Sequence, residues 1–301
     1  MKEIKTIKDI PKEDLIVGGS LACQGCGAIL GIKLVLKALG KNTIMVNSSG
    51  CMTLVPTYPL TSFKIPWIHV AIENGGAVAS GISHALEMKG QKNVNVVVYA
   101  GDGATADIGF QSLSGALDRG DDFIYVCYDN QSFGNTGVQR SSETPYGAYT
   151  TTTPTGKNSH VGNPKQTKPL AKIIAAHGIP YVATAAVGYP LDFIRKLQKA
   201  SKIKGPKFIH LLSPCQPGWG YETHDTINTG KLAVQTGFWP LYEMENGKFM
   251  LNMNPGKLKP VEEYLKTQVR FRHLEKKNVM LIQQKINERW EKLLKGNFWE
   301  S

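Results

Sequence analysis

The chain has 301 residues, of which 42% are hydrophobic and 20% charged, and its formal net charge is +11. That length suffices for one large α/β domain with an extension. No apolar run is long enough to span a membrane, and the charged N-terminus lacks the apolar core of a secretory signal. No basic stretch is interleaved with aromatic residues, as nucleic-acid binding would favour. We therefore expect a cytoplasmic protein with a lysine-rich surface that binds neither membrane nor nucleic acid.

Apolar runs alternate with amphipathic segments along the chain. We expect an N-terminal arm at 1–17, a main domain at 18–215 and an extension at 216–301 with too little apolar material for its own core. The alternation predicts an α/β fold with a doubly wound, mostly parallel sheet. Strands are predicted at 43–46, 69–72, 94–98, 123–128, 181–185 and 207–212, helices at 28–39, 77–88, 104–117, 170–176, 191–201 and 275–294, and a hairpin at 238–251.

Three segments are expected to contact another chain. The helix at 77–88 is rich in Gly, Ala and Ser, which permit close packing. The segment 139–168 is rich in Thr, Ser, Gly, Pro and Asn, and loops of this length are often functional. The extension is expected to cover both the domain and a partner, which the net positive charge suggests is acidic.

Four of the five cysteines share a pattern that suits a metal centre. Cys23 and Cys26 form a C-x2-C pair, while Cys51 and Cys215 each follow a predicted strand. Four thiolates bind either a single zinc ion or an iron–sulfur cluster, and the C-x2-C pair by itself leaves both open. Cys127 lies inside an apolar strand and is interpreted as a small core residue.

A second constellation lies around two further strand ends. Asp102 follows the strand at 94–98 between two glycines, and Asn130 follows the strand at 123–128. Ligands bind beyond the carboxyl ends of parallel strands, so both side chains are expected to face one site. The glycines allow a close approach of backbone to an anion, and carboxylate, amide and phosphate oxygens suit Mg²⁺.

The motifs Gly101-Asp102-Gly103 and 130–137 (Asn-Gln-Ser-Phe-Gly-Asn-Thr-Gly) resemble those of one known family. They are similar to the thiamine diphosphate motif in the β subunit of the 2-oxoacid:ferredoxin oxidoreductases, above all the pyruvate enzyme. The resemblance covers roughly residues 18–220 and the tail. It implies a thiamine diphosphate-binding fold with Mg²⁺ and a [4Fe–4S] cluster.

The resemblance also assigns residues. The side chains of Asp102 and Asn130 and the carbonyl of Ser132 would bind Mg²⁺. The cluster would be held by Cys23, Cys26, Cys51 and Cys215. The candidate catalytic residues are Asn135, as a donor to substrate, and Cys51. The cofactor would be lined by Gly101, Asp102, Gly103, Ala104, Asn130, Gln131, Ser132, Phe133, Gly134, Asn135 and Cys51.

The implied activity is the reversible, coenzyme A-dependent oxidative decarboxylation of pyruvate, with electrons passed through the cluster to ferredoxin. The implied partners are α, γ and δ-type subunits, including a pyrimidine-binding chain and a ferredoxin-like chain. A branched-chain 2-oxoacid or oxalate are alternative substrates. A non-redox thiamine decarboxylase half would explain only the Asp102 motif, and a four-cysteine zinc protein would explain only the cysteines.

Glu73 and the histidines have no firm assignment from the sequence. Glu73 precedes the helix at 77–88, where it is either the carboxylate that activates thiamine or an acidic residue favoured by the helix dipole. In the family that this chain resembles, the activating glutamate lies on another subunit. The seven histidines are scattered singly and are interpreted as structural or solvated.

Overall fold

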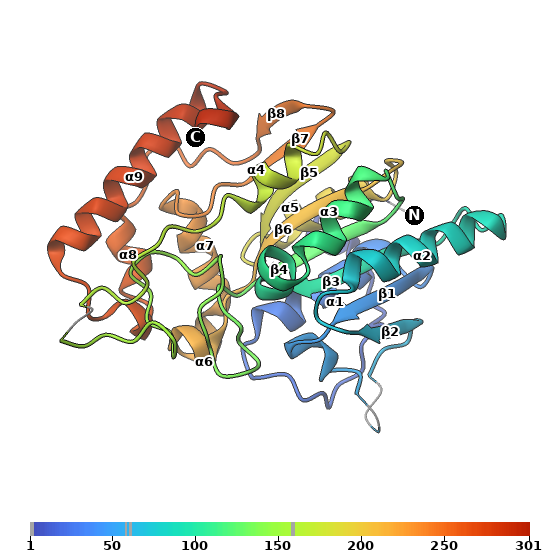
Figure 1. Ribbon diagram of the computed structural model, residues 1–301, viewed down its shortest axis with the longest axis horizontal. Helices are drawn as coiled ribbons and strands as arrows, with labels where there is room; N and C mark the ends of the chain where they lie inside the picture. The colour runs from blue at the N-terminus through green and yellow to red at the C-terminus, as the bar shows by residue number, and fades with distance from the viewer. Residues whose placement is uncertain (1–2, 58, 60–61, 158–159) are drawn as a thin grey trace.

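A computed structural model describes residues 3–57, 59, 62–157 and 160–301. Its centre is an eight-stranded sheet in the order β2-β1-β3-β4-β6-β5-β7-β8 (Figure 1). The first six strands in this order are parallel, and β7 and β8 complete one edge as an antiparallel hairpin. The strands are β1 (Thr43–Ser48), β2 (Trp67–Val70), β3 (Asn95–Gly101), β4 (Ile124–Asp129), β5 (Tyr181–Ala186), β6 (Lys207–Leu212), β7 (Tyr242–Glu245) and β8 (Lys248–Leu251).

Helices cover both faces of the sheet, which confirms the doubly wound α/β prediction. Helices α1 (Gly27–Leu39) and α5 (Pro190–Ala200) share one core with one face of the strands. Helices α2 (Gly75–Met88), α3 (Phe110–Asp118) and α4 (Leu170–Ala175) pack on the other face (Figure 1). Because the parallel strands are buried on both faces, they are almost continuously apolar.

The chain reverses its direction of travel across the sheet between β1 and β3. From β1 it adds β2 on one side, and then crosses back to add β3 on the other. In open α/β sheets such a point leaves a crevice at the carboxyl ends of the strands, where ligands bind. The fold therefore predicts a ligand site among the loops that follow β1, β3 and β4.

The segment after β3 differs from the single helix predicted there. The residues of η3 (Gly103–Ile108) form a π-helical turn, and α3 starts only at Phe110. A Cβ atom on Gly109 would lie 2.3 Å from the carbonyl oxygen of Ala104, so the junction admits only glycine without rearrangement. π-Helical turns are frequent at functional sites.

The extension packs on the main domain through an apolar cluster that also contains Ala148, Ala186 and Leu212 of that domain. It contains α6 (Gln216–Trp219), η4 (Thr223–Asp225), α7 (Thr226–Gln235), the β7–β8 hairpin, α8 (Val261–Leu265), η5 (Val269–Phe271), α9 (Lys276–Leu294) and η6 (Phe298–Glu300). Each short element contributes only a few apolar residues, so no single run reveals the core. The extension's buried members of this shared cluster include Trp219, Leu232, Val234, Leu241, Val261, Tyr264, Phe271, Ile282 and Ile286.

The segment 139–168 contains no helix or multi-residue strand among its described residues. Most residues between 141 and 150 are nevertheless buried, so this half packs largely on its own chain. The N-terminal arm contributes Ile4, Leu15 and Ile16 to the core, together with η1 (Ile7–Asp9) on its surface. None of the helices in the described part of the chain has the length and apolarity needed to cross a bilayer.

Candidate functional site

Four neighbouring strands of the sheet bring the predicted site residues to one edge. Asp102 follows β3 and Asn130 follows β4, and these strands pair directly. Cys51 lies just beyond β1, and Cys215 just beyond β6, which are the outer neighbours of β3 and β4. The two constellations of the sequence therefore lie at adjacent strand ends.

Asp102 is fully buried and is oriented by two donors. Its Oδ1 accepts the main-chain N–H of Asn130 at 3.2 Å, and its Oδ2 accepts the hydroxyl of Ser141. Burial raises the pKa of Asp102 well above its usual range, and the nearby charge of Asp129 raises it further. Among the described residues no cationic side chain forms an ion pair with Asp102. A buried carboxylate without a counter-charge is costly, and a metal cation would supply that charge.

The turn that follows β4 is held from several sides. Gln131 has a positive φ of 64°. Its N–H donates to Asp129 Oδ1 at 2.8 Å, and its carbonyl accepts the hydroxyl of Thr144 at 2.7 Å. The carbonyl of Asn130 accepts the indole N–H of Trp219 at 2.8 Å. These bonds fix the turn in a conformation that is uncommon for a residue with a side chain.

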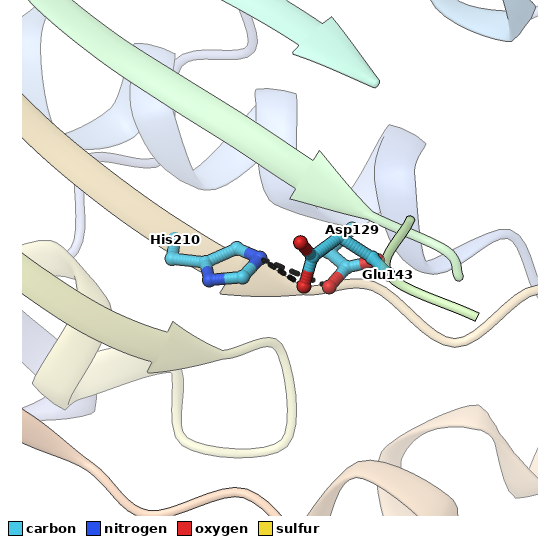
Figure 2. Close-up of side chains that lie close together, drawn as sticks. All are labelled: Asp129, Glu143 and His210. Carbon is cyan, nitrogen blue, oxygen red and sulfur yellow. Dashed lines mark hydrogen bonds and ion pairs between the residues drawn. The ribbon is translucent and has the colours of Figure 1, made fainter. Parts of the chain in front are cut away.

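A buried cluster lies directly behind this turn. His210 Nε2 lies 2.9 Å from Asp129 Oδ2 and 4.0 Å from Glu143 Oε2 (Figure 2). Asp129 Oδ1 accepts the main-chain N–H of Gln131, while its Oδ2 contacts His210. The Asp129–His210 pair therefore stabilises the turn. Burial raises the pKa of Glu143 well above its usual range, and Asp129 and Asp102 reinforce the shift. Glu143 borders a cavity of about 360 Å³ under α4 and α9, where water can satisfy its second oxygen.

The loop at 132–140 projects from the same edge. It is closed by main-chain bonds between Phe133 and Gln139 and between Val138 and Phe133. A Cβ atom on Gly103 would lie 2.3 Å from the ring of Phe133, so the second glycine of the Gly-Asp-Gly motif lets this ring approach the backbone. Asn135, at the tip of the loop, is exposed in the chain taken alone.

The loop that carries Cys23 and Cys26 docks beside Cys215. The N–H of Gly27 donates to the carbonyl of Pro214 at 3.0 Å, and a Cβ on Gly27 would collide with Pro214. The four thiols Cys23, Cys26, Cys51 and Cys215 are free of disulfides and interact electrostatically with one another. Cys127 is fully buried inside β4, away from the solvent that reaches the other four.

The spacing of the thiols bears on the choice of metal. Among the described residues, Asp129, Glu143 and His210 bring three possible ligand atoms within 4.8 Å of one another, and no three cysteine sulfurs lie that close together. Four sulfurs around one zinc, each about 2.3 Å from the ion, would lie about 4 Å apart. A four-iron cluster binds each thiolate to a different iron and so accommodates wider spacing.

Burial keeps Cys26, Cys51 and Cys215 protonated in the absence of metal, because it raises the pKa of each thiol. It raises the pKa of Cys51 to about 12 and that of Cys215 to about 11. The neighbouring thiols reinforce both shifts, because each added thiolate repels the next. Such thiols are poor nucleophiles by themselves and fit a role as metal ligands whose protons are displaced on binding.

Several residues of the site escaped sequence analysis. Ser141 binds Asp102 from 39 positions away, and Asp129, Glu143 and His210 meet only in the fold. Their hydrogen-bond partners are distant in sequence, so no spacing predicts them. Glu73 is half-buried just before α2, and its main-chain carbonyl accepts the hydroxyl of Ser112. A Cβ atom on Gly109 would lie 3.1 Å from the Cα of Glu73.

Comparison with known proteins gives consistent matches. Residues 48–211 match the family described as the thiamine pyrophosphate enzyme, C-terminal TPP binding domain. Pyruvate synthase subunit PorB of Methanothermobacter marburgensis is 54% identical, over 92% of this chain and 96% of that protein. Ketoisovalerate oxidoreductase subunit VorB of Pyrococcus furiosus is 49% identical, over 98% of this chain and 97% of that protein.

Among solved structures, a chain of the 2-oxoglutarate:ferredoxin oxidoreductase from Magnetococcus marinus is similar. The TM-score is 0.59 at 22% identity, with 73% of this chain and 74% of that chain covered. This likeness extends to the fold, including the mostly parallel sheet.

Proposed function

This chain belongs to the thiamine pyrophosphate enzymes and, among them, to the PorB and VorB type of oxidoreductase subunit. From this we propose that it is the cofactor-binding subunit of a pyruvate:ferredoxin oxidoreductase. The complex would oxidise pyruvate and coenzyme A to acetyl-coenzyme A and CO2, and pass the electrons singly to ferredoxin. In the reverse direction it would synthesise pyruvate.

One observation carries this proposal: an oriented carboxylate–amide pair and four free thiols lie at adjacent strand ends of one sheet. A non-redox thiamine enzyme would account for Asp102 and Asn130 but not for the thiols. A zinc protein would account for the thiols but not for the buried carboxylate. An enzyme that removes electrons from a thiamine-bound substrate needs both.

The residues beyond β3 and β4 fit Mg²⁺ and a diphosphate. Asp102 would supply a carboxylate oxygen, Asn130 an amide oxygen and Ser132 a carbonyl, which is the hard-oxygen set that Mg²⁺ prefers. The bonds from Asn130 and Ser141 hold the Asp102 carboxylate in place before a metal arrives. Gly101, Gly103 and Ala104 would line the diphosphate, since the glycines leave the backbone accessible.

When bound, thiamine diphosphate supplies the electron sink for decarboxylation. The chain itself would orient that cofactor and exclude water around it. Phe133, packed against Gly103, and the braced turn at Gln131 and Ser132 would cover it, together with Gly134. Asn135 and Cys51 would be the groups nearest the substrate, with the Asn135 amide donating a hydrogen bond to its carboxylate or ketone.

We further propose that Cys23, Cys26, Cys51 and Cys215 hold a [4Fe–4S] cluster. Among the described residues no three of these sulfurs lie within 4.8 Å of one another, which supports a cluster over a single zinc ion. Cys51 follows β1 and Asp102 follows the neighbouring β3, so the cluster would lie close to the thiamine site, as electron transfer between them requires.

The proposed assembly contains α, γ and δ-type subunits, and ferredoxin is the proposed electron acceptor. This chain contains one diphosphate-binding sheet, so the pyrimidine of the cofactor would be held by a partner. Residues 18–215 would be the cofactor domain, with 216–301 as the extension that supports it.

A substrate panel on the purified complex tests the proposal. Pyruvate should give the highest rate of coenzyme A-dependent reduction of viologen or ferredoxin. The VorB relatives make branched-chain 2-oxoacids the second candidate, and a preference for 2-oxoisovalerate would select it. Failure of every 2-oxoacid to reduce the acceptor, in a complex that contains thiamine diphosphate and iron, would refute the oxidoreductase assignment.

A further inference from the structure

One buried cation of the extension has no role in the site described so far. Arg270 lies in η5 and is 4% exposed. Its Nε donates to Gln268 Oε1 at 2.9 Å, and one terminal nitrogen donates to Gln131 Oε1 at 2.6 Å. Both acceptors are neutral amides, and Arg270 forms no ion pair within the described ranges of the chain.

A guanidinium in such a position requires compensation. Burial lowers the pKa of Arg270 to about 10, so the side chain still carries its charge at neutral pH. Removing a charge from water is expensive unless an opposite charge lies close by. The fold retains Arg270 here, which points to an anion that completes the site.

Trp219 connects Arg270 to both halves of the proposed active site. The guanidinium carbon of Arg270 lies 3.9 Å from the centre of the Trp219 ring. The main-chain N–H of Trp219 donates to the carbonyl of Cys215 at 2.8 Å, and its indole N–H donates to the carbonyl of Asn130 at 2.8 Å. Arg270 therefore lies where the Cys215 loop and the Asn130–Gln131 turn meet.

Tyr264, Cys215 and Asp129 interact electrostatically with Arg270. Burial raises the pKa of Tyr264 to about 12, so this phenol is neutral at pH 7. Asp129 is already engaged by the N–H of Gln131 and by His210. Cys215, by contrast, lies where four thiolates would carry a net negative charge once a cluster is bound. A bound cluster at Cys215 is therefore the anion that Arg270 would face.

We propose that Arg270 is the counter-charge of the iron–sulfur cluster, a positioning residue that raises the reduction potential of the cluster. A reduced cluster carries one more negative charge than an oxidised one, so a fixed cation stabilises the reduced form more. This inference rests on the proposed function, because it requires the cluster at Cys23, Cys26, Cys51 and Cys215.

The test uses the assembled complex, kept anaerobic, with a redox titration followed by electron paramagnetic resonance. The signal of this cluster is identified as the one that a Cys51→Ala variant lacks. Arg270→Gln should keep the iron content and lower the midpoint potential, with a change of about tenfold in the one-electron equilibrium constant, which is about 59 mV. Arg270→Lys, which retains the charge, should restore most of that potential.

The matched control is Arg289→Gln. Arg289 is another guanidinium with a pKa lowered by burial, but it donates to the carbonyls of Gly237 and Phe238 and has none of the cysteines among the groups that shift its pKa. This variant should leave the midpoint potential unchanged.

The possible outcomes separate the two proposals. A parent complex without the Cys51-dependent signal would refute the cluster itself. A cluster present in Arg270→Gln at the parent potential would overturn the role of Arg270, as would equal shifts in Arg270→Gln and Arg270→Lys. If Arg270→Gln cannot hold the cluster, Arg270→Lys decides: a cluster at the parent potential supports the counter-charge, and loss of the cluster there too overturns it.

Discussion

Asp102 Oδ1 accepts the main-chain N–H of Asn130 at 3.2 Å, although the two residues belong to different strand ends. This bond joins the loop after β3 to the turn after β4. With Ser141 on the other oxygen, it sets the direction of the carboxylate in the absence of any metal. The site is therefore organised before the cofactor binds, which lowers the cost of binding.

Asp102→Asn should weaken Mg²⁺ and thiamine diphosphate together. The variant loses the negative charge that binds the metal. Its amide NH2 group would also face one of the two hydrogen-bond donors, the N–H of Asn130 or the hydroxyl of Ser141, and so lose that bond. We expect a loss of at least about 100-fold in affinity, above the roughly 10–100-fold typical of residues that only support metal ligands. Calorimetric titration of both ligands measures this.

Asp107→Asn is the matched control, because Asp107 lies in the same segment, η3, but bonds to Ser142. It should bind both ligands nearly as tightly as the parent. Unchanged cofactor affinity in Asp102→Asn would make Asp102 a turn residue and no more.

Ser141→Ala should weaken cofactor binding without abolishing it. The variant removes one of the two donors that orient Asp102, so metal affinity should fall by about 10–100-fold. Ser142→Ala, which loses only the bond to Asp107, is the comparison for folding effects. Equal cofactor affinities in the two variants would show that Ser141 does not support the metal site.

Replacing Cys23, Cys26, Cys51 or Cys215 by Ala should abolish the cluster, whereas Cys127→Ala should keep it. Cys127 lies fully buried in β4, so the change removes only packing, at a cost on the order of 1 kcal/mol. Iron and sulfide analysis of the five variants, with thermal unfolding, checks both statements. A full cluster in Cys215→Ala would contradict the assignment.

The strands, the sheet edge and the residues that follow the strands could be predicted from the sequence. Apolar runs such as 123–128 carry a local signal, and parallel strands place their carboxyl ends together whatever else the chain does. The positions of Asp102, Asn130, Cys51 and Cys215 at one edge follow from these two facts.

The support behind the site could not be predicted in the same way. Ser141, His210 and Arg270 reach the site from a long loop, a strand interior and the extension, through contacts that leave no periodicity. The number of apolar residues that the extension adds to the apolar cluster shared with the main domain was underestimated for a related reason. Its apolar residues are spread over short elements such as α7 and α8, which bury them only after they have assembled.

Features of the isolated chain indicate that its site is incomplete. Asn135, the proposed donor to the substrate, is exposed at the tip of its loop, and Cys23 is exposed as well. On the outer face of α2, Met88 is 90% exposed, and a Cβ on Gly81 would meet no atom within 4 Å. A partner that covered the loop tip at Asn135 would also exclude water from the reaction.

The isolated chain should therefore bind iron and sulfide yet release no CO2 from pyruvate, and the partner subunits should restore turnover. The described residues form one sheet, with the proposed diphosphate site at its edge, and catalysis also needs a carboxylate that activates the pyrimidine of thiamine. Release of labelled CO2 by the chain alone, compared with the reconstituted complex at equal cofactor loading, measures this. Rapid decarboxylation by the lone chain would refute the split site and identify Glu73, at the start of α2, as the activating carboxylate. Glu73→Gln in the complex should otherwise keep most of the activity, because the partner would supply that group.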